Sequence, residues 1–146
     1  VEDEPHLIAD TVEVLREVYP NNLFRTTITV EEAVRTLLDI EVDLIVMDIF
    51  IPMQSTSWQS AAAVMGPRAE RYRANIRHLG GLALLDELDR LNYQGKILLH
   101  TSCTDYELLQ SIQSSDSQLS GQICGKLPKP APMDILLSAL AEHLVD

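Results

Sequence analysis

The sequence predicts an α/β domain in which helices cover both faces of a parallel sheet. Amphipathic helical segments alternate with short apolar runs along the 146 residues, with mostly short connections. Two of these runs, 44–47 (LIVM) and 97–99 (ILL), are apolar throughout. A strand with one exposed face alternates between apolar and polar residues, so continuous runs indicate strands that are buried on both faces, as in parallel sheets.

The individual elements follow from the spacing of their apolar residues. Residues three and four apart share a helix face, and this spacing predicts helices over 5–19, 29–40, 80–92, 105–115 and 132–145. The second of these helices also has a start signal, because Thr29 and Glu32 have the spacing of a capping box. Apolar and β-branched runs predict strands over 21–28, 43–48, 95–102 and 122–127.

A further strand is expected before the acidic residues 2–4, but only Val1 stands there. A strand of one residue would leave backbone groups of its neighbours unpaired. We therefore expect this first strand to be truncated, and either residues upstream of Val1 in a longer protein or another segment to fill its place. Residues 1–146 are expected to form a single domain.

Composition and charge argue against several classes of function. The net charge of −11 disfavours direct binding to nucleic acid or to acidic membrane surfaces. No apolar run approaches the roughly 20 residues of a membrane span. No signal peptide opens the sequence, and a cytoplasmic location is expected.

Polar side chains follow the predicted strands at the points where the strands end. The acidic residues 2–4 follow the truncated first strand, and Asp48 follows the apolar run 44–47. Thr101 lies at the end of the strand predicted over 95–102, and Lys129 lies beyond the strand predicted over 122–127. In parallel sheets such groups gather outside the carboxyl ends of the strands. The sequence therefore predicts one pocket that holds several carboxylates, a hydroxyl and an ammonium group.

A pocket of this composition suits phosphoryl chemistry. Clustered carboxylates repel one another, and a hard divalent cation such as Mg²⁺ removes that cost with oxygen ligands. A carboxylate on a strand end is a competent nucleophile toward phosphorus, and the transfer itself requires mainly positioning and charge stabilisation. Asp48 is the predicted nucleophile.

The chain resembles the receiver domains of two-component response regulators, such as the chemotaxis receiver. The matching stretches are VEDEP (1–5), DLIVMDIFIP (43–52), GGLALLDEL (80–88), ILLHTS (97–102) and KLPKP (126–130). They occur in the family's order along almost the whole chain. The resemblance implies a flavodoxin-like, doubly wound sheet of five parallel strands in the order 2-1-3-4-5, with helices on both faces.

The resemblance also implies a role for each site residue. Asp48 would accept a phosphoryl group, and Thr101 and Lys129 would contact it. Glu2, Asp3, Asp48 and the backbone carbonyl of Phe50 would hold Mg²⁺. The Lys129–Pro130 bond would be cis, a geometry that only X-Pro bonds adopt readily.

The partners and signalling role are likewise implied by the family. The phosphoryl donor would be a histidine kinase or a histidine phosphotransfer protein of a phosphorelay. The domain would change conformation on phosphorylation, act on a C-terminal or separate output domain or form a homodimer, and would not turn over a metabolite. Slow autophosphatase chemistry would end the signal.

The chain departs from the family in an insertion at residues 53–79, between the third strand and the third helix. We expect one or two helical pieces there, because 55–65 carries helix-forming alanines and Pro67 suits a first helical turn. Four arginines make the segment basic: Arg68, Arg71, Arg73 and Arg77. They are expected either to pair with the protein's own acids or to form a lid or docking surface over the pocket.

An alternative function is that of a degenerate receiver that acts as an interaction module without phosphorylation. The insertion favours it, and so does Lys126, which stands where receivers usually carry an aromatic switch residue. The complete set of acidic pair, acceptor, hydroxyl and lysine argues against it. A flavin-binding domain would need a phosphate loop where EDEPH (2–6) stands, and a haloacid-dehalogenase-type phosphatase would need an aspartate at Phe50.

Overall fold

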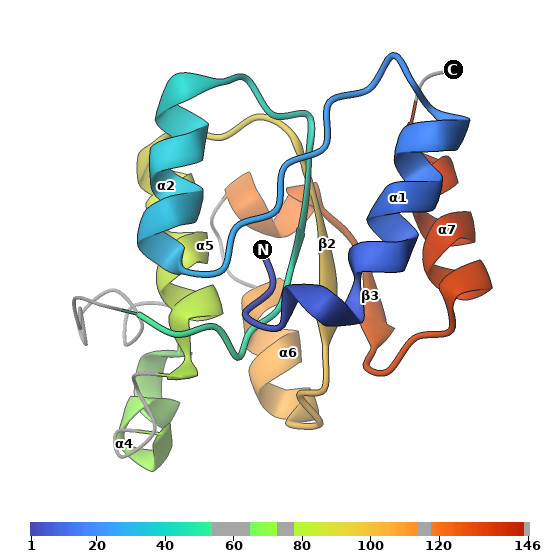
Figure 1. Ribbon diagram of the computed structural model, residues 1–146. Helices are drawn as coiled ribbons and strands as arrows, with labels where there is room; N and C mark the ends of the chain where they lie inside the picture. The colour runs from blue at the N-terminus through green and yellow to red at the C-terminus, as the bar shows by residue number, and fades with distance from the viewer. Residues whose placement is uncertain (54–64, 73–77, 114–117, 145–146) are drawn as a thin grey trace.

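The computed structural model describes residues 1–53, 65–72, 78–113 and 118–144. Helices pack on both faces of a central parallel sheet (Figure 1). The α-helices are α1 (Ala9–Val18), α2 (Val30–Asp39), α4 (Ala69–Tyr72), α5 (Gly80–Arg90), α6 (Tyr106–Gln113) and α7 (Met133–Ala141). The strands are β1 (Leu44–Met47), β2 (Lys96–Thr101) and β3 (Ile123–Pro128). Short 3₁₀ helices cover Pro5–Leu7, Gly66–Arg68 and Gln118–Gln122.

The three strands lie in the order β1-β2-β3, and both pairings are parallel. Leu44 is opposite Lys96 at the start of β1, and Thr101 is opposite Pro128 at the end of β2. All three strands therefore end at the same edge of the sheet. This edge receives the residues that follow each strand in the sequence.

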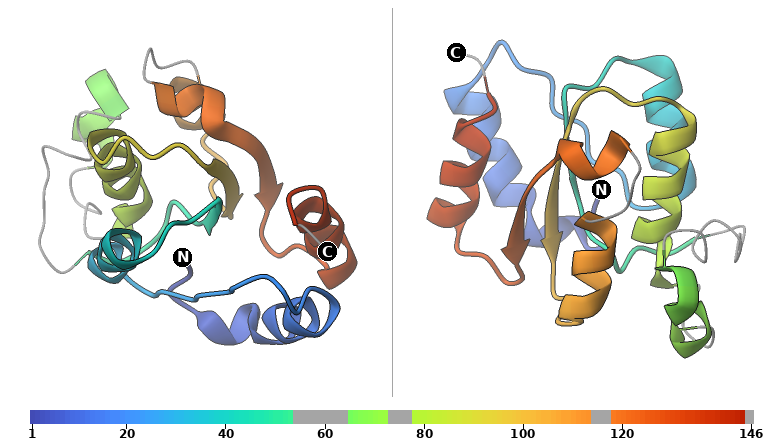
Figure 2. Two further views of the ribbon diagram at one scale, coloured as in Figure 1. Left: turned by 90° about the horizontal axis from the view of Figure 1, so that it is seen from above. Right: turned by 180° about the vertical axis from the view of Figure 1, so that it is seen from behind.

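Helices lie against both faces of the sheet (Figure 2), and two apolar clusters hold them there. One face packs against α2, α5 and α6 through fully buried side chains such as Met47, Leu84 and Leu99. The other face packs against α1 and α7, where Leu98 of β2 meets Leu15 and Leu136. Continuous apolar runs were expected for strands buried on both faces, and β2 confirms this because Ile97 to Thr101 are all buried.

The prediction of a five-stranded flavodoxin-like sheet in the order 2-1-3-4-5 is wrong. The described residues form one sheet of three strands. The segment expected as a strand over 21–28 has no regular secondary structure, and one backbone bond, from Glu2 N–H to the Thr27 carbonyl (2.9 Å), joins it to the start of the chain. A strand requires a continuous ladder of such bonds, and Val1 and Glu2 are too short a partner to supply one.

A cavity of about 520 Å³ lies beside β1, where the prediction placed the truncated first strand. Its walls include apolar side chains from both layers, among them Val12, Leu37, Val46 and Leu140. Residues 1–2 and 22–27 line the same hollow, but neither segment pairs with β1 as a strand.

The helix predictions are largely confirmed, with shorter ends. The predicted 5–19 helix is a 3₁₀ turn followed by α1, while α2 begins after Thr29, whose hydroxyl oxygen accepts a hydrogen bond from Glu32 N–H (3.2 Å). The insertion contains the 3₁₀ turn Gly66–Arg68 and α4, in agreement with a helical piece there. The piece expected over 55–65 lies almost wholly outside the described residues, as do Arg73 and Arg77.

Candidate functional site

The carboxyl edge of the sheet brings Asp48 and Lys129 together from opposite strands. Asp48 follows β1, and Lys129 follows β3. The Lys129 ammonium donates a hydrogen bond to Asp48 Oδ2 (2.7 Å) and also contacts Glu2. Its backbone N–H donates to the carbonyl of Thr101 (3.1 Å), which fixes this segment beside the end of β2. The Lys129–Pro130 bond is cis, as expected.

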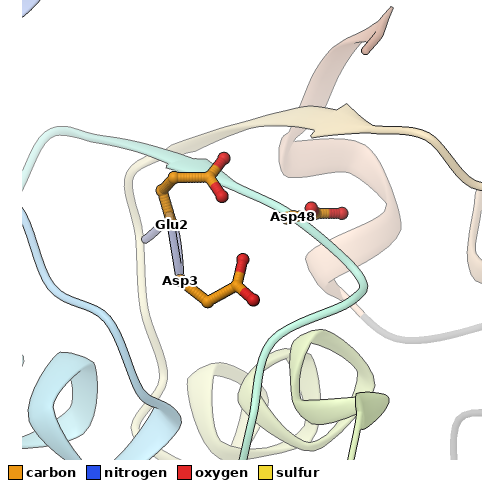
Figure 3. A group of neighbouring side chains, drawn as sticks. All are labelled: Glu2, Asp3 and Asp48. Carbon is orange, nitrogen blue, oxygen red and sulfur yellow. The ribbon is translucent and has the colours of Figure 1, made fainter. Parts of the chain in front are cut away.

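Glu2 and Asp3 reach the site from the first residues of the chain. The Val1 amine donates to the Val46 carbonyl (2.6 Å), and Asp48 N–H donates to the Val1 carbonyl (3.3 Å), so this end is held along β1. Figure 3 shows the carboxylates of Glu2, Asp3 and Asp48 facing a common space. One oxygen from each lies within 4.8 Å of the other two.

This arrangement is electrostatically unbalanced. Glu2 and Asp48 are 3% and 4% exposed, and the Lys129 side chain is 12% exposed, while Asp3 lies at the surface. Three carboxylates thus face the Lys129 ammonium group, because the buried Val1 amine beside them has its pKa lowered to about 6, chiefly by burial, and carries little charge at neutral pH. Carboxylate oxygens are the donors that a hard divalent cation prefers, so the donor types suit Mg²⁺, whose binding stays a prediction.

The electrostatics of Lys129 follow from its two partners. Burial alone would lower the pKa of Lys129, but the hydrogen bonds to Asp48 and Glu2 outweigh it and raise the pKa above its usual value. The ammonium therefore stays charged throughout the neutral range. It can neutralise one carboxylate, or a phosphoryl group attached to it.

The surroundings of Asp3 favour the neutral form of its side chain. Burial raises the pKa of Asp3 above its usual value of 3.8, and the hydrogen bond and negative charge of Glu2 raise it further, against a smaller opposing effect of Lys129. In the window between 3.8 and this raised value the folded state binds more protons than the unfolded state. The free energy of unfolding therefore falls as the pH rises through that window.

We expect Asp3→Asn to remove this part of the pH dependence in metal-free protein. The variant should be more stable than the wild type above the window, because it no longer adds a charge beside Glu2. Urea unfolding at a series of pH values, with chelator present, measures the effect. Glu4→Gln, which changes an exposed neighbour, should leave the profile as it is; an Asp3→Asn profile parallel to the wild type would contradict the assignment.

Thr101 lies at the end of β2 and is buried, but its hydroxyl does not reach Asp48 by a hydrogen bond within the described part of the chain. Its oxygen instead accepts from Cys103 N–H (3.2 Å). A hydroxyl that accepts one hydrogen bond still has its own hydrogen to donate. Thr101 is thus placed near the site with its donor available, and the expected contact with a phosphoryl group stays a prediction.

The loop after Asp48 is fixed by the start of α5. Phe50 N–H donates to Asp48 Oδ1 (3.1 Å), and Gly81 N–H donates to the Ile49 carbonyl (3.0 Å). A Cβ atom at Gly81 would overlap the Asp48 carbonyl oxygen and the Ile49 backbone, so only glycine permits this approach. The role of the Phe50 carbonyl as a metal ligand stays a prediction.

Sequence reasoning missed two features beside the site. His100 on β2 is 7% exposed, its Nε2 has no hydrogen-bond partner among the described residues, and its pKa is lowered by burial and then by the charge of Lys129. Asp105 accepts hydrogen bonds from Tyr72 of α4 and from Leu108 N–H (3.0 Å). Its position before YELLQ is a helix-cap signal, but nothing in the sequence indicates the contact with Tyr72.

The structure places one of the four arginines beside an acidic residue of the chain. The Arg71 guanidinium lies 3.9 Å from Asp105 and its side chain is 63% exposed, in agreement with pairing to the protein's own acids. The lid alternative also needs Arg73 and Arg77, which lie outside the described residues, and the Arg68 side chain, which is likewise not described.

No protein-family model matches this chain, and no curated protein matches it. Among the described helices, none combines the length and apolar character that crossing a bilayer requires.

Proposed function

We propose that this chain is a receiver-type signalling domain that accepts a phosphoryl group on Asp48. One observation carries the proposal: Lys129 bridges Asp48 and Glu2, with Asp3 in reach, at the carboxyl edge of a parallel sheet. Structural ion pairs do not require three acids around one ammonium group. The imbalance is the kind expected of a site that also takes a cation and a phosphate.

The proposed reaction needs little from the protein beyond placement. An oxygen of Asp48 forms a bond to phosphorus as the P–N bond of the donor's phosphohistidine breaks, and the electron pair leaves on the imidazole nitrogen. Lys129 neutralises charge on the phosphoryl oxygens, and the Thr101 hydroxyl donates a hydrogen bond to one of them. Each role matches a side chain already located at this edge.

Mg²⁺ would be held by Glu2, Asp3, Asp48 and the Phe50 carbonyl. When bound, it would neutralise charge that develops on the transferring group. The chain's own contribution is to keep three carboxylates close together and partly dry, at the cost of their mutual repulsion.

The proposed partners follow the same resemblance. A histidine kinase or histidine phosphotransfer protein would supply the phosphoryl group in the cytoplasm. The readout would be an output domain, attached or separate, or a homodimer. Because the domain would accept one phosphoryl group, on Asp48, and would not turn over a metabolite, it would act as a switch.

The alternative is an interaction module that works without phosphorylation. Lys126 supports it, because this side chain is exposed on β3 and cannot turn into the core without burying its charge. The two candidates differ in whether Asp48 reacts, so chemical labelling separates them.

The deciding experiment is incubation with Mg²⁺ and acetyl phosphate, followed by peptide mass spectrometry. We expect one phosphoryl group on the peptide that contains Asp48, and its loss when Mg²⁺ is chelated. Labelling that persists in chelator, or that maps to another residue, would count against the proposed site. Absence of labelling, together with absence of beryllofluoride binding, would favour the interaction module.

A further inference from the structure

We infer that Tyr72, from the inserted segment, is a positioning residue for the Asp48 site, and that it holds the β2–α6 connection in its resting conformation through Asp105. This inference rests on the proposed function. The insertion would then set how readily the site accepts a phosphoryl group, through a contact remote from the chemistry.

The contact joins two segments far apart in the sequence. Tyr72 ends α4, and its hydroxyl donates a hydrogen bond to Asp105 Oδ2. Asp105 precedes α6, where its other carboxylate oxygen accepts from Leu108 N–H (3.0 Å), as a capping residue does. Arg71 lies 3.9 Å from the same oxygen as Tyr72, but its exposure makes this pair a minor contributor. Asp105 is thus held by α4 and α6 together.

The connection between β2 and α6 begins at Thr101 and ends at Asp105. Between them, Cys103 donates its N–H to the Thr101 hydroxyl oxygen (3.2 Å). Four consecutive peptide units therefore join Thr101, whose hydroxyl lies at the site, to Asp105, whose carboxylate Tyr72 holds. Cys103 and Tyr72 both pack against the larger apolar cluster, which limits how far either end moves alone.

The resting geometry opposes phosphoryl binding. On the proposed path, the Thr101 hydroxyl leaves Cys103 N–H as it meets a phosphoryl oxygen on Asp48, and that N–H then needs a new partner. The connection must shift to supply one, and the shift strains the Tyr72–Asp105 contact. A ligand that binds only the shifted state has a lower apparent affinity when that state is sparsely populated. Loss of the Tyr72–Asp105 contact should populate the shifted state more and so tighten binding.

Beryllofluoride with Mg²⁺, which mimics the phosphoryl group on an aspartate, provides the measurement. We expect Tyr72→Phe to bind it about threefold to tenfold more tightly than the wild type, the range that the loss of one hydrogen bond spans. Tyr106→Phe removes a hydroxyl from an exposed tyrosine directly after Asp105 and should bind as the wild type does. Asp105→Asn retains a capping oxygen and should tighten binding in the same direction as Tyr72→Phe.

A reciprocal measurement excludes a merely structural role. If the contact opposes binding, then bound beryllofluoride must loosen the contact by the same factor. We expect amide exchange in α4 to quicken on binding in the wild type, and the change to vanish in Tyr72→Phe. Equal affinities for the wild type, Tyr72→Phe and Asp105→Asn would overturn the inference. A wild type that does not bind beryllofluoride would instead overturn the proposed function beneath it.

Discussion

Replacing Asp48 with asparagine is expected to abolish phosphoryl labelling and to raise the free energy of unfolding of metal-free protein by about 1–2 kcal/mol. The first effect follows because an amide oxygen is not a nucleophile of carboxylate strength. The second follows from the balance of charges around Asp48, where one attraction competes with two repulsions and with the cost of burying the charge.

Approximate magnitudes decide the sign of the stability effect. At 2.7 Å the attraction between Lys129 and Asp48 is about 6 kcal/mol at an effective dielectric of 20. Repulsion from Glu2 and from Asp3, each within 4.8 Å, is at least about 3.5 kcal/mol apiece at the same dielectric. The repulsions match the attraction before desolvation of a 4% exposed carboxylate is counted, and desolvation also favours the neutral side chain.

Urea unfolding in chelator measures this gain, and Asp89→Asn, which neutralises an exposed aspartate on α5, is the matched control. The control should change stability by less than about 0.5 kcal/mol. Added Mg²⁺ should stabilise the wild type more than Asp48→Asn, since the variant has lost a ligand. An Asp48→Asn protein less stable than the wild type in chelator would show that Asp48 is held mainly as a structural partner of Lys129.

Much of the site could be predicted because its chemistry follows strand ends. Asp48 stands directly after an apolar run and Lys129 directly after the last strand, and parallel strands of one sheet bring such positions to one edge. The same logic places Thr101, although not the direction of its hydroxyl. Side-chain direction depends on local partners such as Cys103 N–H, which no periodicity reveals.

The strand expected over 21–28 failed for a related reason. β-Branched and aromatic residues such as Phe24 and Thr27 suit a pleated surface, but this preference becomes a strand only when a neighbour supplies a ladder. Here the neighbour is the short start of the chain, and one backbone hydrogen bond forms. The strand predicted over 43–48 forms at 44–47, where each of the four residues pairs in parallel with a residue of β2.

The contact between Tyr72 and Asp105 was beyond sequence reasoning altogether. It depends on where the insertion folds back, which is a property of tertiary packing. Asp105 could be recognised as a cap for α6, and α4 as a helix, but their meeting could not. Tyr72, one of the two partners, lies in the segment expected as an insertion.

Replacing Lys129 with methionine is expected to lower the free energy of unfolding by about 3 kcal/mol in metal-free protein at neutral pH. Methionine keeps much of the side chain's length and apolar stem but removes the ammonium that bridges Asp48 and Glu2. Two carboxylates, 3% and 4% exposed, then face each other without a cation, and removal of one partner from a buried ion pair is costly.

Three further measurements distinguish this cause from a general packing defect. The loss should shrink as the pH falls, because a carboxyl without its ammonium partner takes up a proton more readily in the folded state, and stability then rises with acidity. It should also shrink in the Asp48→Asn background, since a double-mutant cycle reports the coupling between the two groups. Lys126→Met, which alters an exposed lysine on β3, should change stability by less than about 0.5 kcal/mol. A loss that is the same at every pH and in both backgrounds would mean that Lys129 supports the fold through its stem, and that the charge balance proposed for this site does not exist.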